Sequence, residues 1–321
     1  MTLSYNAKDK SFVLLTHDKE KAERVGLTLS RKAYGPKGES VFYTADYQKN
    51  PEYNPYAAIP FYNEADAKAK TELEPFIKQY NDSFATEADH KLAAPAGMDY
   101  LPYQKAGIAY AKNKGNVLIG DEPGLGKTIQ ALGVINQNEG QRNLIICPAS
   151  IRLNWEREIR KWSLLGYNTP SRYASVNTIL TASKGVSPTS DFNVISYDLL
   201  SRNDALHEAL CEVEWDNIVI DECHYLKTTD AKRTQAIFGT AKGHYAKQFV
   251  TQKAKNVLGL TGTPLPNRPR ECYTVTRALC WEAIDFMSYD AFCYRFNPSK
   301  KLDYNAVLEK KGRLPELQAR L

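Results

Sequence analysis

Short apolar runs alternate with stretches of helical period over the last two thirds of this 321-residue chain. The apolar runs are Asn116–Gly120, Asn143–Cys147, Phe192–Ser196, Asn217–Ile220 and Asn256–Leu260. The helical patterns cover 128–137, 150–162, 198–211 and 230–240. Apolar runs without polar alternation are typical of strands buried on both faces, and their separation by helices favours a parallel, doubly wound sheet. The pattern therefore predicts an α/β fold for residues 96–321.

The first 95 residues follow a different pattern. They are polar and hold eight of the chain's 20 tyrosines. Strands are predicted at Ser11–Leu15 and Ser40–Thr44, and helices at Asp18–Leu27 and Ala65–Tyr80. Asn50–Tyr56 is typical of a turn-rich loop, and Pro75 is expected to kink or break the second helix. We therefore predict a small α+β domain at 1–95, with Lys91–Gly97 as the linker to a second domain at 96–321.

Composition narrows the class of protein. A chain of 321 residues suits about two domains, and 43% hydrophobic residues suffice for globular cores. No stretch approaches the ~18 apolar residues of a membrane span, and Met1–Lys10 lacks the apolar core of a signal peptide. The six cysteines form no Cys-x-x-Cys pair. We therefore expect a reduced chain without a zinc site or a membrane partner, cytoplasmic in a bacterial or phage-infected cell or nuclear in a eukaryote.

Charge is spread unevenly along the chain. Residues 1–95 carry 13 Lys and Arg against 14 Asp and Glu, whereas residues 96–321 carry 29 against 23. Between 227 and 255, seven basic residues face only Asp230; they are Lys227, Lys232, Arg233, Lys242, Lys247, Lys253 and Lys255. Such a run is either a footprint for a nucleic-acid backbone or a solvated face that another domain covers.

The segment DEPGLGKT at 121–128 follows one apolar run and precedes a helical pattern. Strand, glycine-rich turn, Lys-Thr and helix are the layout of a phosphate-binding loop. Gly124 and Gly126 allow close approach of the backbone, whose N–H groups can cradle phosphate oxygens. We expect Lys127 to add charge there and the Thr128 hydroxyl to hold Mg²⁺. The general pattern has Gly at the position of Asp121, so the loop departs from it at that residue.

Three further segments carry candidate chemistry. Asp221 ends an apolar run in the same sheet and is expected to hold Mg²⁺, and Glu222 to orient and deprotonate an attacking water. His224 follows at a position suited to sensing the γ-phosphate. Thr261-Gly-Thr263 follows another apolar run with short hydroxyl side chains. Gln104 lies about 20 residues before the loop, and its amide matches the N6/N7 edge of adenine.

Taken in order, these segments resemble a known family. They are Tyr-Gln at 103–104, DEPGLGKT, ICPAS with NWEREI, ISYDLL, IDECHYLK and LTGTPLPNRPRE. The order is similar to that of the Snf-type branch of superfamily-two helicase-like ATPases over about residues 98–321. This branch has Asp at the position of Asp121, so the departure supports the resemblance. Pro123 and Cys223 replace the more common Met and Ala, and neither is expected to touch the chemistry.

The resemblance implies a RecA-like P-loop lobe that uses ATP and Mg²⁺ on double-stranded or branched DNA. It implies nucleotide contacts from Gln104, Pro123, Gly124, Leu125, Gly126, Lys127 and Thr128, with Lys127, Asp221 and Glu222 as the catalytic set. His224, Thr261, Gly262 and Thr263 would couple nucleotide state to DNA. Pro148, Ser150, Ser196, Tyr197, Lys227 and Arg233 would contact DNA, although helix capping and surface charge also explain these residues, and Ser150 suits an N-cap.

The same resemblance implies a second RecA-like lobe that supplies arginine fingers. Only 58 residues follow Thr263, whereas a second lobe takes roughly 150. We therefore expect a fragment or one half of a split enzyme, with the second lobe in trans. Two functions stay open: an ATP-driven DNA translocase, remodeller or annealing helicase, and a non-catalytic lobe that binds nucleotide and DNA. Phe42-Tyr-Thr44 also resembles an element in the N-terminal domain of HARP-like annealing helicases.

Overall fold

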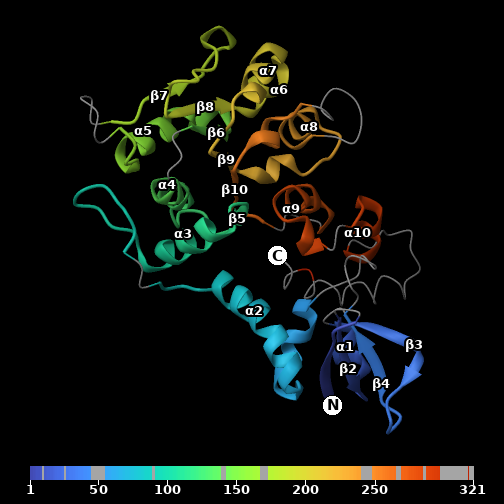
Figure 1. Ribbon diagram of the computed structural model, residues 1–321. Coiled ribbons are helices and arrows are strands. Elements are labelled where there is room, and N and C mark those ends of the chain that lie inside the picture. Colours follow the sequence, from blue (N-terminus) through green and yellow to red (C-terminus); the bar gives the residue numbers. More distant parts are fainter. Residues whose placement is uncertain are drawn as a thin grey trace. The chain divides into compact units, whose positions relative to one another are not determined.

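The computed structural model describes residues 1–8, 11–24, 27–44, 55–88, 91–138, 142–166, 173–239, 248–264, 269–284, 287–296 and 317. These residues form two compact units, which Figure 1 colours along the chain. One unit is Ala85–Pro266, and the other combines Met1–Phe84 with Asn267–Leu321. The predicted division between 95 and 96 stays a prediction. Within the described residues, no helix is long and apolar enough to cross a membrane.

A six-stranded parallel sheet organises the unit Ala85–Pro266. Its strands are β5 (Val117–Ile119), β6 (Asn143–Cys147), β7 (Val176–Thr178), β8 (Phe192–Ser196), β9 (Asn217–Asp221) and β10 (Asn256–Leu260). Their order in the sheet is β5-β10-β9-β6-β8-β7. Every residue of β6, β8 and β9 is buried, as expected for strands covered on both faces. The predicted α/β class is confirmed, and the short strand β7 was not predicted.

Helices flank this sheet in two groups (Figure 1). One group packs α3 (Pro102–Lys114), α4 (Lys127–Gln137) and α5 (Arg152–Trp162) together, and the other packs α6 (Tyr197–Arg202), α7 (Asp204–Glu212) and α8 (Lys232–Phe238). The prediction of a single helix over 198–211 is wrong, because α6 and α7 are separate helices. Asn203 leaves the helical conformation, and its side chain accepts a hydrogen bond from Leu206 N at 2.8 Å to cap α7.

The start of α5 also differs from the capping expected at Ser150. A 3₁₀ turn, η2 (Ala149–Ile151), precedes the helix, and Ile151 occupies the cap without a side-chain hydrogen bond. Ser150 is exposed within that turn. The capping role expected for Ser150 is therefore wrong. Ser196 does cap a helix, because its hydroxyl accepts from Leu199 N at 3.4 Å at the start of α6.

A row of asparagines, two of them fully buried, fixes the register of the central strands at their amino ends. Asn143, Asn217 and Asn256 begin β6, β9 and β10 and stand opposite one another in the ladder. Asn217 donates to the side chain of Asn143 at 2.8 Å and accepts from Asn256 at 3.1 Å and from Asn138 at 2.8 Å. Because a slip of one residue would separate all of these amides, the row specifies one register.

The other unit contains an antiparallel sheet of order β1-β2-β4-β3. Its elements are β1 (Thr2–Asn6), β2 (Ser11–Thr16), α1 (Lys19–Arg24), β3 (Thr28–Tyr34), β4 (Ser40–Tyr43), the 3₁₀ segment η1 (Pro55–Glu64) and α2 (Ala67–Ser83). Clustered with them are η7 (Pro269–Glu271), α9 (Tyr273–Leu279), η8 (Trp281–Ile284) and α10 (Tyr289–Phe296). The predicted α+β character of the N-terminal part is confirmed, although β1 and β3 were not predicted.

Two details of this N-terminal part bear on the predictions. Helix α2 runs through Pro75 without interruption, so the predicted break is wrong. Pro75 is exposed, so water can satisfy the carbonyl group that its missing N–H leaves without a helical partner. Thr44 is buried, donating its N–H to Phe12 O at 2.9 Å and accepting from Phe12 N at 2.8 Å. Thr44 therefore ties the end of β4 to β2.

The predicted linker is bound to the sheet unit. Ala93 N–H donates to the Gln137 side chain at 3.0 Å, and the same amide group donates back to Ala93 O at 2.9 Å. Tyr100 Oη also donates to Ala93 O at 3.1 Å. The segment around Ala93 is thus attached to α4. Of the predicted loop Asn50–Tyr56, residues 50–54 lie outside the described residues.

We predict that Asn217→Ala lowers the free energy of unfolding of the sheet unit by about 3 kcal/mol, because it removes three amide hydrogen bonds and leaves the buried Asn143 Oδ1 without this donor. Urea unfolding followed by tryptophan fluorescence measures this, since Trp155, Trp162 and Trp215 all lie in this unit. Asn113→Ala, on the exposed face of α3, is the control and should change it by less than about 0.5 kcal/mol. If both substitutions lower the free energy of unfolding equally, the hydrogen bonds of the asparagine row do not stabilise the strand register.

Candidate nucleotide-binding site

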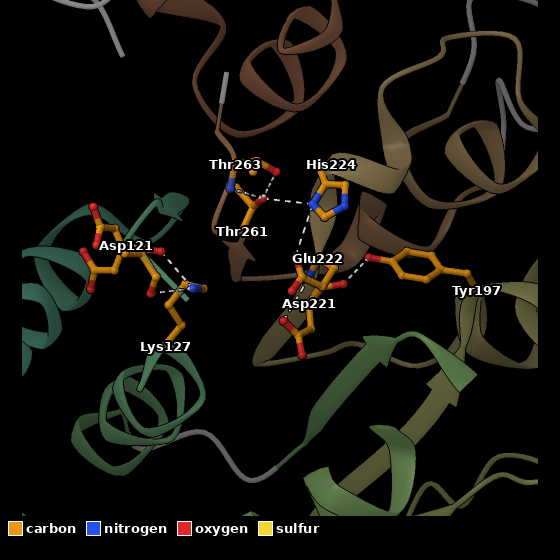
Figure 2. Close-up of polar contacts among 9 residues, drawn as sticks. Asp121, Lys127, Tyr197, Asp221, Glu222, His224, Thr261 and Thr263 are labelled. Atoms are coloured by element: carbon orange, nitrogen blue, oxygen red, sulfur yellow. Dashed lines mark hydrogen bonds and ion pairs between the residues drawn. The ribbon is translucent and has the colours of Figure 1, made fainter. Parts of the chain in front are cut away.

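Three loops leave the sheet side by side at the carboxyl ends of β5, β10 and β9, which are neighbours in the sheet. Residues 120–126 follow β5, residues 261–263 follow β10, and Glu222 follows β9. Figure 2 shows His224, Glu222, Thr261 and Thr263 from the two loops after β9 and β10 in mutual contact, and Lys127 against the backbone of the loop after β5. In parallel α/β sheets, this edge is where ligands bind, because loops and helix N-termini converge there.

The glycine-rich loop has the backbone that its sequence requires. Gly124 and Gly126 both adopt left-handed conformations, with φ of 89° and 77°. A Cβ at Gly124 would meet nothing within 4 Å, so the conformation rather than lack of space selects glycine there. Helix α4 begins directly at Lys127, and its cap, Gly126, provides no side chain to the N–H groups of the first turn. Those groups are available to an anion.

Lys127 lies across the loop that precedes it. Its Nζ donates to Asp121 O at 2.8 Å and to Glu122 O at 3.1 Å (Figure 2). The ammonium group is thus held inside the turn by main-chain oxygens. Phosphate oxygens can replace these acceptors, which makes the position suitable for a lysine that binds phosphate.

The structure gives a physical reason for aspartate at position 121. Its carboxylate accepts a hydrogen bond from Gln130 Nε2 at 2.5 Å, and Gln130 is fully buried in α4. The Asp121 side chain therefore ties the start of the loop to the helix that follows it. Glycine at this position could not make that contact. Sequence reasoning missed Gln130, although a glutamine among the apolar residues Ala131 and Leu132 signals a buried polar partner.

Gln104 is buried rather than exposed, and it holds the loop from α3. Its Oε1 accepts from Leu101 N at 3.0 Å, and its Nε2 donates to Leu125 O at 3.2 Å. Tyr103 Oη donates to the same carbonyl at 3.1 Å. A Cβ at Gly126 would lie 2.6 Å from Gln104 Nε2, so glycine is also needed for this contact. An amide has a second N–H and a second lone pair, and the predicted adenine contact would use these.

Asp221 closes β9 and is largely buried. One carboxylate oxygen accepts from Trp155 Nε1 at 2.8 Å, the other from Glu222 N at 2.9 Å, and Tyr197 Oη donates to Asp221 O at 2.6 Å. Burial raises the pKa of the Asp221 carboxyl, whereas the Trp155 hydrogen bond and the charge of Lys127 act in the opposite direction. Sequence reasoning missed Trp155; a buried indole N–H usually finds a partner, which is the only signal available.

Glu222 has a backbone conformation that is costly for any residue with a Cβ. Its φ of 53° and ψ of 47° are left-handed, and it is the one such non-glycine residue in the described part of the chain. Its carboxylate lies 3.1 Å from His224 Nδ1, which also lies 3.0 Å from Thr261 Oγ1 (Figure 2). His224 thus contacts both the acidic segment after β9 and the hydroxyl segment after β10.

The hydroxyl segment also meets the glycine-rich loop. Thr263 N–H donates to Thr261 Oγ1 at 3.0 Å. A Cβ at Gly262 would approach Pro123 Cγ to 2.9 Å, so glycine allows the two loops to pack. The structure therefore brings together the predicted residues Pro123, Lys127, Asp221, Glu222, His224 and Thr261-Gly-Thr263. Residues 265–268 of the longer motif lie outside the described residues.

The residues predicted to contact DNA occupy different environments. Tyr197 is buried, and its hydroxyl is bound to Asp221, while Ser196 caps α6. Ser150, Lys227 and Arg233 are exposed, and Pro148 is partly exposed. Lys232 lies 3.3 Å from Asp204 and Lys255 lies 2.6 Å from Asp216, so acids outside the 227–255 run offset part of its charge. Lys242 and Lys247 lie outside the described residues.

The donor set fits a nucleotide with a divalent cation. Mg²⁺ takes oxygen ligands and keeps several waters, so one carboxylate and one hydroxyl suffice on the protein side. Asp221 supplies the carboxylate, and Thr128 supplies a hydroxyl in the first turn of α4. The positive charge of Lys127, at the start of the same helix as Thr128, acts to lower the pKa of the Asp221 carboxyl. Lys127, Thr128 and Asp221 are therefore suited to hold phosphates and Mg²⁺.

We predict that the free energy of unfolding of Glu222→Gly is about 1 kcal/mol higher than that of Glu222→Ala, because glycine adopts this positive φ without strain. Both substitutions remove the carboxylate and its contact with His224, so the two variants differ only in the Cβ. Chemical denaturation of the two variants measures the difference. Equal stability, or a more stable Ala variant, would show that the left-handed backbone at residue 222 carries no cost.

Comparison with known proteins agrees with this geometry. A family model described as the SNF2-related domain matches residues 103–310. In the structure of the Sulfolobus solfataricus SWI2/SNF2 ATPase core in complex with dsDNA, the similar chain is 27% identical, with a TM-score of 0.51. The match covers 71% of this chain and 46% of that chain.

Named relatives are similar over parts of their length. The bovine (Bos taurus) DNA annealing helicase and endonuclease ZRANB3 is 34% identical over 183 residues, covering 56% of this chain and 16% of that protein. The SWI/SNF-related matrix-associated actin-dependent regulator of chromatin subfamily A-like protein 1 of Xenopus tropicalis is 31% identical over 236 residues. This match covers 73% of this chain and 22% of that protein. This chain thus spans about a fifth of each relative. With the family model matching well over half of it, the chain belongs to the SNF2-related family of helicase-like ATPases.

Proposed function

We propose that this chain is the ATP-binding half of a DNA-dependent ATPase that translocates on, remodels or reanneals duplex DNA. The observation that carries the proposal is the contact of His224 Nδ1 with both Glu222 and Thr261, at 3.1 and 3.0 Å. This contact joins the expected hydrolytic carboxylate to a second loop, at the same sheet edge as the glycine-rich loop. Because His224 connects Glu222 to the loop after β10, the Glu222 carboxylate can respond to a ligand that binds on the loop after β10.

Each residue has a role in this proposal. Lys127 and the N–H groups at the start of α4 bind the β- and γ-phosphates. Thr128 and Asp221 hold Mg²⁺, which neutralises phosphate charge when bound. Glu222 orients water and accepts its proton. Thr261 and Thr263 position His224, and Gln104 holds Leu125 while its remaining N–H and lone pair face adenine.

The DNA partner is supported by the neighbour solved with dsDNA and by the exposed residues Ser150, Lys227 and Arg233. The family also favours a second RecA-like lobe, supplied in trans or by a longer chain, that brings arginine fingers to the γ-phosphate. Such a finger contributes ~10³–10⁵ in rate, so turnover by the lobe alone would be slow. The similarity to a protein named as a DNA annealing helicase favours annealing among the possible outcomes.

A second candidate is a non-catalytic lobe that binds nucleotide and DNA. It is favoured by the hydrogen bonds of Lys127 and Gln104 to backbone oxygens, which make the loop stable by itself. The presence of Lys127, Asp221 and Glu222 in one site favours the catalytic function, because binding alone does not require Glu222.

We predict that Lys127→Ala lowers the affinity for a fluorescent ATP analogue with Mg²⁺ by about tenfold or more, since a charge-assisted hydrogen bond contributes ~1.5–3 kcal/mol. Fluorescence titration measures this affinity. Lys112→Ala, on an exposed position of α3, is the matched control and should leave it unchanged. Unchanged affinity in the Lys127 variant would refute the phosphate-binding assignment.

We predict that reversing Lys232 and Arg233 to Glu weakens duplex DNA binding and lowers the slope of log affinity against log salt by about one to two. Counterion release at lost phosphate contacts is the physical reason. Lys78→Glu, on α2, reverses an exposed charge elsewhere and serves as the control. If the double variant and the control share the wild-type slope, the α8 surface does not contact the DNA backbone.

A further inference from the structure

Two aromatic side chains hold Asp221 from opposite flanking helix groups. Trp155 comes from α5 and Tyr197 from α6, and both are almost fully buried. Trp155 Nε1 donates to the Asp221 carboxylate at 2.8 Å, and Tyr197 Oη donates to Asp221 O at 2.6 Å. We propose that Trp155 and Tyr197 are positioning residues that fix this carboxylate for Mg²⁺. The inference rests on the function proposed above.

The Trp155 contact orients the carboxylate plane. An ionised carboxylate offers about four lone-pair positions. Trp155 takes one on Oδ2 and Glu222 N–H takes one on Oδ1, so two directions are defined and the others remain for a cation or its waters. A hydrogen bond from a buried donor to a charged acceptor is strong and directional. The carboxylate therefore cannot rotate without breaking both bonds.

The Tyr197 contact holds the backbone that carries this carboxylate. The chain turns sharply after Asp221, because Glu222 is in the left-handed region. A hydroxyl at 2.6 Å from the Asp221 carbonyl oxygen restrains the peptide between these residues (Figure 2). One aromatic residue thus fixes the side chain and the other fixes the main chain. Groups that orient a metal ligand typically change metal affinity by ~10–100-fold when they are removed.

Core packing alone is the competing explanation, and α5 itself offers the comparison. Trp155, Ile159 and Trp162 form its buried face. Within the described residues, the indole N–H of Trp162 has no hydrogen-bond partner. Trp162→Phe therefore changes core packing on the same helix without touching Asp221. For Tyr197, the matched residue is Tyr273, which is buried in the other unit and donates its hydroxyl to Met287 O at 2.9 Å.

The test measures binding of a fluorescent ATP analogue by the full chain in Mg²⁺ and in EDTA. The gain in affinity on adding Mg²⁺ reports the metal site without requiring turnover. Trp155→Phe should reduce this gain by about tenfold or more and raise the Mg²⁺ concentration for half-saturation, with affinity in EDTA unchanged. Tyr197→Phe should lower the gain by a smaller factor, and Trp162→Phe and Tyr273→Phe should not change it.

A gain in Trp155→Phe equal to that in Trp162→Phe, together with a wild-type gain in Tyr197→Phe, would overturn the proposal. If Trp155→Phe fails to unfold cooperatively, Tyr197→Phe decides the question, because it removes only a hydroxyl. Failure of the proposed function gives a different result: Lys127→Ala then binds the analogue as wild type does, in Mg²⁺ and in EDTA alike.

Discussion

The register of strand β9 is the constraint on which the site depends. This strand lies between β6 and β10, with Asn217 at its start and Asp221 at its end. At the start, amide groups from β6, β10 and the end of α4 converge on Asn217. At the end, Trp155 and Tyr197 hold Asp221. Since side chains alternate along a strand, a slip of one residue would turn Asp221 toward the opposite face.

The loops proposed to meet DNA are continuous with the elements that hold Asp221. Pro148–Ser150 leads through a 3₁₀ turn into α5, which carries Trp155, and Ser196 directly precedes Tyr197. A ligand on either loop would therefore act close to the expected metal carboxylate. A third connection runs through His224, which contacts both Glu222 and Thr261 in the loop after β10. These contacts supply a physical basis for coupling between two ligands, because each loop contributes both a surface and a contact to the site.

Much of this arrangement follows from sequence patterns. Five apolar runs predicted five of the parallel strands, and parallel strands place their carboxyl ends at one edge, so the meeting of Lys127, Asp221 and Thr261 was predictable. Two of the three strands that were missed have weaker patterns: β3 contains Ser30, Arg31 and Lys32, and β7 has three residues. The break at Asn203 depends on a cap within an otherwise helical pattern. The Trp155 hydrogen bond joins residues 66 positions apart, and periodicity predicts a buried face but not a partner.

Coupling between the nucleotide site and duplex DNA is the central claim, and linked binding tests it most directly. A fluorescent ATP analogue with Mg²⁺ is titrated into the chain with and without saturating duplex DNA, and the DNA affinity is measured with and without the analogue. The account predicts that each ligand changes the affinity for the other by the same factor, about fivefold or more. Two affinities that do not depend on each other would contradict it.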